Sequence, residues 1–385
     1  GQGIQDNTPR PPSVLVSELI ETLAPDGVLP TGAPPAGLVT EHRLQSFSRA
    51  YFQCGAPLFS YSREDLAACA GSGARRDPDP FFRRALPMTP EDTGRWRAVS
   101  LEGLRAFFAN PARFLVQNRL GIRLENEAAR IDESEPFALD PLCAYRLGQG
   151  MLQHRLAGSD PMELFEVFRA AGDLPHGRVG DYLFARLSAE VDAFAARVRD
   201  LLPPGTPEPV DVAHEIGGFH VTGRLSKLSV QGCVQVRYAG VKAKDFLAIW
   251  LQHLLLCLAA PGVADRRSLL IGKGQAWAFG PVPGAAQILD TLLGLYRHGL
   301  TEPLPFFPES SRVFFEKLAD LGGDEPQALA AARSQWRGSD YAPGESENAY
   351  YTLCFGEREP LEDDFKRLSV AVFQPLFEHG RKIPG

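Results

Sequence analysis

The chain has 385 residues, of which 44% are hydrophobic and 23% charged, and its formal net charge is −7. This composition is typical of a soluble protein with two or three domains, and the negative charge excludes a uniformly basic surface, so DNA contacts would require a local basic patch. The six cysteines form no CxxC pair, which argues against a zinc or disulfide framework and fits a reducing cytoplasm. No segment has the character of a signal peptide or a membrane span, and a start at Gly1 is expected of a piece of a longer protein.

The N-terminal part of the chain combines a helix signal with long loops. Ser13 precedes an apolar stripe, which predicts a serine-capped helix. Residues 71–97 interleave arginines with aromatic side chains in a loop-like segment. Such a mixture can hold single-stranded DNA by charge and stacking, but we favour a solvated loop whose aromatic residues pack into the core. The candidate DNA contacts of this segment are Arg83, Arg84 and Trp96.

Three strands are predicted near the middle of the chain. Val210–Ile216 and Phe219–Leu228 alternate apolar and polar residues, and Cys233–Tyr238 is rich in valine. We predict that the second and third strands form a hairpin and that all three lie in one mixed central sheet.

Two helices are expected to cover this sheet, at Gly180–Val198 and Lys244–Ala260. The second helix is nearly all apolar but too short to cross a bilayer, so we expect it in the core. The sequence Gly272-Lys273-Gly274 lacks the spacing of a phosphate-binding loop and is interpreted as a hairpin turn.

Two short motifs on the predicted strands resemble the active site of PD-(D/E)XK nucleases of the RecB type. That family has an aspartate on one strand and the sequence D-Y-K on the next; the two carboxylates hold Mg²⁺ and the lysine positions water. Here Ser226 and Arg237 stand at the acidic positions and Ala239 stands at the lysine. A guanidinium only donates hydrogen bonds and repels a divalent cation. The resemblance therefore implies an α/β, restriction-endonuclease-like core, with a mixed sheet flanked by helices, whose catalytic residues are lost.

Positive charge is expected where the family holds its metal. Arg224 alternates onto the face of Ser226, and Arg237 replaces an acid, so both are candidate DNA contacts. These arginines could guide DNA phosphates or form salt bridges with Asp211 or Glu215. We favour the salt bridges because a buried guanidinium needs a partner.

An alternative is an active Mg²⁺-dependent nuclease whose ligands have migrated to Asp211, Glu215 and Asp245. Asp245 begins a predicted helix, however, and capping is the more common role of a carboxylate there. The residues His214, Glu215 and His220 lack HExxH spacing, so no metal site is predicted from them.

Further stretches resemble the C-terminal region of the RecC family, the gamma subunits of exodeoxyribonuclease V (RecBCD). They occur in the family's order and cover nearly the whole chain. The stretches are residues 4–7 with 12–16 and 18–20, Asn110-Pro111 with Phe114, residues 132–137, the sequence FRAAGDLP at 168–175, residues 250–254 and residues 308–310.

This second resemblance implies that residues 1–98 end a helicase-like region and that residues 99–385 form a catalytically degenerate nuclease-like domain. The implied role is non-enzymatic: binding RecB and RecD, and helping to split duplex DNA and guide its single strands during recombinational repair in the cytoplasm. Mg²⁺ and ATP would be used by the partner subunits, so no cofactor is expected in this chain. Some relatives place an iron–sulfur cysteine where this chain has Asn110, so no cluster is expected either.

Overall fold

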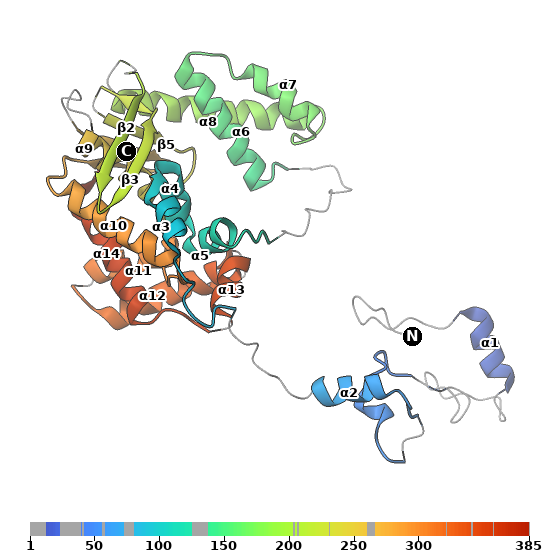
Figure 1. The fold of residues 1–385 in the computed structure, drawn as a ribbon. Coiled ribbons are helices and arrows are strands. Elements are labelled where there is room, and N and C mark those ends of the chain that lie inside the picture. The colour runs from blue at the N-terminus through green and yellow to red at the C-terminus, as the bar shows by residue number, and fades with distance from the viewer. Residues whose placement is uncertain are drawn as a thin grey trace. The chain divides into compact units, whose positions relative to one another are not determined.

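The computed structural model describes residues 13–23, 40, 42–55, 58–72, 81–124, 138–202, 205, 208–230, 232–259, 266–320, 322–339, 342–356 and 358–384. The sequence stretches at residues 4–7 and 132–137 lie outside this part of the chain. The chain divides into two compact units, Gly1–Pro78 and Asp79–Gly385. The first contains helix α1 (Val14–Leu23), the 3₁₀ turn η1 (Arg49–Tyr51) and α2 (Arg63–Ser72) (Figure 1). The helix predicted after Ser13 is confirmed.

All the sheets formed by the described residues lie in the second unit. Its helices, in chain order, are α3 (Pro90–Arg97), α4 (Leu101–Ala109), α5 (Pro111–Phe114), η2 (Leu115–Arg119), α6 (Pro141–Ala157), α7 (Met162–Ala170), α8 (Arg178–Leu201), α9 (Ala243–Ala259), α10 (Ala285–Gly299), α11 (Pro308–Asp320), α12 (Glu325–Arg337), η3 (Glu345–Glu347), α13 (Ala349–Phe355) and α14 (Asp363–His379). Its strands are β1 (Ala98–Ser100), β2 (Val210–Ile216), β3 (Phe219–Leu225), β4 (Leu228–Ser229), β5 (Gly232–Val236), β6 (Ser268–Gly272), β7 (Gln275–Phe279), β8 (Gly338–Ser339), β9 (Ala342–Pro343) and β10 (Gly380–Ile383).

A small sheet has the order β1-β3-β2. Strands β2 and β3 are antiparallel and are joined by a tight turn at Gly217 and Gly218, which have φ values of 57° and 79°, a region that favours glycine. Strand β1 pairs with β3 in parallel. The buried side of β3 carries Phe219, Val221 and Leu225, as its alternation predicted.

A larger mixed sheet has the order β10-β7-β6-β5-β4. Strands β5 and β6 are parallel, and β6 and β7 form an antiparallel hairpin around the predicted turn at Gly272-Lys273-Gly274, which is confirmed. Along β6, Leu269 and Ile271 enter one core cluster and Leu270 enters another, so both faces of the strand are covered.

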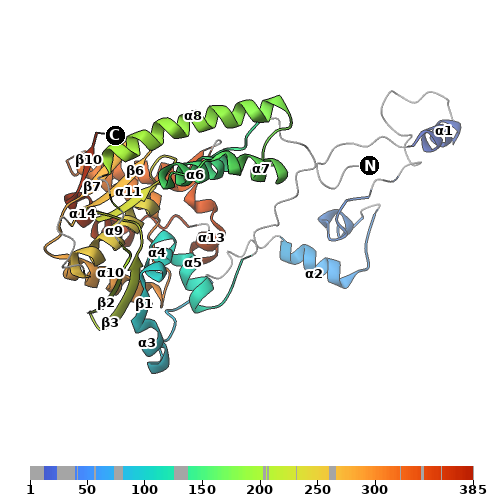
Figure 2. The same ribbon diagram turned by 90° about the horizontal axis from the view of Figure 1, so that it is seen from above.

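Helices α8 and α9 cover opposite faces of the larger sheet. Helix α8 belongs, with α6, to the cluster that contains Leu269 and Ile271, whereas α9 belongs to the cluster that contains Leu270. Figure 2 shows α8 running over this sheet beside α6. The two predicted helices are confirmed, but the sheet that they cover contains only one of the three strands predicted for it, β5. No helix in the described ranges is long and apolar enough to span a bilayer.

The prediction of one sheet containing all three central strands is wrong. Strands β2 and β3 lie in the small sheet and β5 lies in the larger one. The predicted hairpin is reduced to β4, in which Leu228 pairs with Cys233 and Ser229 with Gly232. The reason is that a strand has two hydrogen-bonding edges, and β1 and β2 occupy both edges of β3.

A third core cluster lies toward the C-terminus. It is built mainly from aromatic residues of α11 to α14 and the segment before α11, including Phe307, Phe314, Trp336 and Phe365. Figure 1 shows α11, α12 and α14 lying together as a helical layer. The unit is thus mixed α/β, mostly helical, with small mixed sheets.

Candidate functional site

The three residues at the nuclease-motif positions follow strands of two different sheets. Ser226 is exposed directly after β3. Arg237 and Ala239 follow β5, which belongs to the other sheet. Ala239 lies in a bend, where its carbonyl oxygen accepts a hydrogen bond from the backbone of Lys273. The residue also lines a cavity between α6 and α8.

Arg237 forms a shielded ion pair with Asp245. Its Nη1 lies 2.7 Å from Asp245 Oδ2, and the two side chains are only 12% and 11% exposed. The same carboxylate oxygen accepts a hydrogen bond from the backbone N–H of Lys242 at 2.9 Å. Asp245 is the third residue of α9, so this is the return bond of a capping box. Asp245 therefore neutralises Arg237 and also caps the core helix.

The salt-bridge partners predicted for Arg237 are wrong, because Asp211 and Glu215 are used within the small sheet. Arg224 Nε lies 3.9 Å from Asp211 Oδ1 across β2 and β3, with both side chains mostly exposed. His220 Nδ1 lies 2.6 Å from Glu215 Oε1 on the same pair of strands. Arg237 was predicted to need a partner, and it has one, but that partner comes from the following helix.

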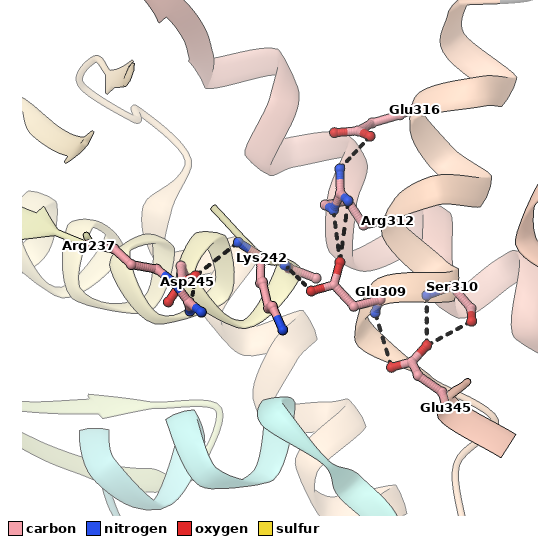
Figure 3. A network of polar contacts seen from close by, with 9 residues as sticks. Arg237, Lys242, Asp245, Glu309, Ser310, Arg312, Glu316 and Glu345 are labelled. Atoms are coloured by element: carbon pink, nitrogen blue, oxygen red, sulfur yellow. Dashed lines mark hydrogen bonds and ion pairs between the residues drawn. The ribbon is translucent and has the colours of Figure 1, made fainter. Parts of the chain in front are cut away.

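A second carboxylate serves the start of α9. Glu309, near the start of α11, accepts a hydrogen bond from the backbone N–H of Ala243 at 2.8 Å. Its other oxygen accepts from Arg312 Nε and Nη2, each at 3.3 Å, and Arg312 also pairs with Glu316 at 2.6 Å (Figure 3). The first turns of α9 and α11 are thereby tied to each other.

A third carboxylate, Glu345, caps α11 from a distant part of the chain. It accepts hydrogen bonds from the backbone N–H groups of Glu309 and Ser310, at 3.2 and 2.8 Å, and from the Ser310 hydroxyl at 2.7 Å (Figure 3). Burial raises the pKa of Glu345, and these donors oppose that rise. Carboxylates are favoured at helix N-termini because the first N–H groups lack partners within the helix. The network is thus explained by helix capping and ion pairing.

The proposed migrated metal ligands are each engaged separately. Asp211 lies beside Arg224, Glu215 beside His220, and Asp245 beside Arg237. Within the described ranges, no three His, Cys, Asp or Glu side chains come together in a group suited to a metal ion.

The other candidate DNA contacts are spread over different elements. Arg83 and Arg84 are exposed in the segment before α3. Trp96, in α3, is half-buried against the core, with its ring 6.2 Å from that of Phe114 and the Arg95 guanidinium 5.1 Å above it. Trp96 therefore packs as an aromatic core residue does.

Sequence reasoning identified Asp245 as a cap but missed its ion pair and the roles of Glu309 and Glu345. The sequence Pro308-Glu309 has the proline and the acidic residue that are typical of the first turn of a helix, so it could have indicated that a helix begins there. The backbone N–H groups that Glu309 and Glu345 bind, at Ala243 and at Glu309 and Ser310, lie 35 to 66 residues away in the sequence, so no local pattern could reveal those bonds.

Comparisons with known proteins support the second family resemblance. The sequence profile of the RecC C-terminal domain matches residues 96–319. The RecBCD enzyme subunit RecC of Escherichia coli (strain K12) is 30% identical over 380 residues, covering 94% of this chain and 33% of that protein. The subunit of the same name from Mycobacterium tuberculosis (strain H37Rv) is 28% identical, covering 92% of this chain and 32% of that protein. The chain therefore spans about a third of the length of these curated relatives. With a matching profile over more than half of its length, the chain belongs to the RecC C-terminal domain family.

Proposed function

We propose that this chain is the non-catalytic C-terminal part of a RecC-type subunit, which binds RecB and RecD counterparts and helps to split DNA and guide its strands in double-strand-break repair by homologous recombination. The observation that carries the proposal is the Arg237–Asp245 ion pair. A nuclease of the resembled type needs a carboxylate at the position of Arg237 to hold Mg²⁺. Here the guanidinium of Arg237 stands at that position, and it also forms an ion pair with the Asp245 carboxylate.

The restriction-endonuclease-like ancestry of the domain belongs to the same proposal. Its support is the mixed sheet between α8 and α9, with the sequence Arg237-Tyr238-Ala239 at the end of a central strand. The helicase-like assignment of residues 1–98 rests on the sequence resemblance.

The partners follow from the relatives, which are named as subunits of the RecBCD enzyme. In the proposed complex, ATP and Mg²⁺ are bound by the RecB and RecD counterparts, and the complex acts on chromosomal DNA in the cytoplasm. The alternative of a Mg²⁺-dependent nuclease in this chain is disfavoured, because its three candidate ligands face three different cationic or titratable partners.

Copurification tests the binding role. The full-length subunit that contains this chain is coexpressed with its RecB and RecD counterparts, and a second subunit is truncated before Asp79. We expect the intact subunit to recover both partners and the truncated one to lose at least one of them. Recovery of the same complex from the truncated subunit would show that Asp79–Gly385 is not needed for assembly.

A further inference from the structure

A cavity of about 470 Å³ lies beside the altered motif, between α6, α8 and the bend that follows β5. Its walls are largely apolar, formed by Leu139, Pro141, Ala144, Leu183, Leu187 and Ala239. Two tyrosines, Tyr145 and Tyr238, also line it, and three charged residues stand at its edge: Arg186, Glu190 and Lys273. None of these groups has a role in the ion pair or the capping network, except that Tyr145 lies against Arg237.

Neighbouring residues fix the positions of Tyr145 and Tyr238. The Arg237 guanidinium lies 5.2 Å from the centre of the Tyr145 ring. Tyr238 is fixed by α6: its backbone N–H donates to Gln149 Oε1 at 2.8 Å, and the missing side chain at Gly148 makes room for its ring. The residue that replaces the motif acid thus supports one wall, and the motif tyrosine forms another.

The cavity edge carries an excess of positive charge. Lys273 Nζ and Arg186 Nε both approach the single carboxylate of Glu190, at 3.5 and 4.0 Å. Lys273 also lies 4.2 Å from the centre of the Tyr238 ring. Both cations remain 46% and 61% exposed, so they can contact a ligand without leaving their present positions. Two cations beside one carboxylate favour an anionic ligand.

Ala239 leaves this cavity open. Ala239 lines the cavity at the position where the resembled motif has lysine. A longer side chain at this lining position would reduce the space left for a ligand. Loss of the lysine therefore has a structural consequence besides the loss of a catalytic group.

We propose that this cavity is a slot for one unstacked nucleotide of a DNA single strand. The base packs against Tyr145 and the apolar walls, and its phosphate lies near Lys273 and Arg186. Aromatic and apolar walls with adjacent cations are the combination used by proteins that hold single strands without reading their sequence. The inference deepens the proposed function, because it rests on this subunit guiding DNA strands.

The test measures binding of a fluorescent oligodeoxythymidylate to the full-length subunit alone, by anisotropy over a salt series. Ala239→Leu fills the slot, and we expect it to weaken binding about tenfold, the loss of one base contact, at an unchanged salt dependence. Lys273→Ala should reduce the slope of log affinity against log salt by about 0.7, the loss of one single-strand phosphate contact. Arg367→Ala is the control, since Arg367 is 62% exposed and pairs within its helix as Arg186 does.

Two outcomes would overturn the proposal. One is an Ala239→Leu protein that retains its melting temperature and its oligonucleotide affinity. The other is loss of RecB or RecD binding by Ala239→Leu with unchanged DNA affinity, which would assign the slot to a partner's side chain. If Ala239→Leu fails to fold, the salt series of Lys273→Ala becomes the test of the slot. An unchanged slope of log affinity against log salt in that variant would overturn the proposal.

The slot and the proposed function can fail separately, because DNA binding is measured without the partner subunits. Failure of the unaltered subunit to assemble with them would count against the proposed function and would not affect the DNA-binding test of the slot.

Discussion

Arg237 and Asp245 form an ion pair at the position where the resembled nucleases hold a metal. Both side chains are nearly nine-tenths buried, so each charge depends on the other for compensation. Asp245 also satisfies a backbone N–H at the start of α9. The pair accounts for the presence of an arginine at an interior position that the resembled nucleases give to an acid.

Removal of one partner of this pair should be costly. Asp245→Ala leaves the guanidinium buried without a counter-charge, and we expect it to lower the free energy of unfolding by about 3–5 kcal/mol. Urea unfolding followed by tryptophan fluorescence is a suitable measurement, because all four tryptophans lie in Asp79–Gly385. The double replacement Arg237→Met with Asp245→Leu should recover most of the loss.

Arg224→Ala provides the matched control for this experiment. Arg224 is 63% exposed and lies 3.9 Å from Asp211, so its removal should change the free energy of unfolding by less than about 1 kcal/mol. Equal effects of Asp245→Ala and Arg224→Ala would show that the Arg237–Asp245 pair is not shielded from water.

At the scale of elements, α6 is attached to the end of β5 by close packing. A Cβ atom at Gly148 would overlap the Tyr238 ring. We therefore expect Gly148→Ala to lower the free energy of unfolding by about 1–3 kcal/mol, the usual cost of overpacking.

Gly294 in α10 is the control for Gly148. A Cβ atom there meets nothing within 4 Å, so Gly294→Ala should stabilise the protein by about 0.5–1 kcal/mol through its better helix propensity. Differential scanning fluorimetry of both variants measures this. A melting temperature for Gly148→Ala at or above that of the unaltered chain would contradict the packing described for α6 and Tyr238.

Helix α9 also carries a buried histidine that makes stability depend on pH. His253 Nδ1 lies 2.9 Å from Ser268 Oγ and its Nε2 lies 2.7 Å from the carbonyl of Gly280. Burial is the main cause that lowers its pKa from 6.5 to about 4, and the nearby His379 contributes in the same direction. Cys257 Sγ, one turn along the helix, lies 3.7 Å from His253 Nε2. Burial raises the pKa of this thiol above its usual value, so it stays protonated at acidic pH.

The direction of the pH effect follows from the lowered pKa of His253. Between pH 6.5 and 4 the unfolded chain binds a proton that the folded chain does not, so stability falls as the pH falls through this window. The loss from this group between pH 7.5 and pH 5 should be about 2 kcal/mol. Urea unfolding of His253→Gln should show a smaller loss over the same range. An equal loss in the variant would assign the pH dependence to other groups.

For the whole molecule, the sequence predicted local elements better than their assembly. Alternation in β2 and β3 and the apolar run of α9 identified these elements. The spacing of apolar residues along a segment reflects whether one face or every face of the element is buried. Strand β1 was missed because three residues, Ala98–Ser100, are too few for a pattern. That omission is the reason for the wrong sheet, since β1 fills the edge of β3 that had been assigned to the strand at Cys233.

The candidate site shows the same limit. Ser226, Arg237 and Ala239 were located by motif, and the absence of a carboxylate at these three positions can be read from the residue types alone. The partner of Arg237 could not be predicted, because the orientation of the bend between β5 and α9 decides which carboxylate it reaches. Glu309 and Glu345 reach their targets through the packing of helices that are distant in sequence.

The central claim is that this chain supplies no nuclease site to the complex in which we place it. The most direct measurement assembles the full-length subunit with its RecD counterpart and with a RecB counterpart whose own D-Y-K acid is replaced by alanine, and follows Mg²⁺-dependent cleavage of linear duplex DNA. The account predicts that cleavage disappears while ATP-dependent unwinding remains. Residual Mg²⁺-dependent cleavage that is lost on Asp211→Asn or Glu215→Gln in this chain, whose exposed side chains can be replaced at little cost in stability, would contradict it.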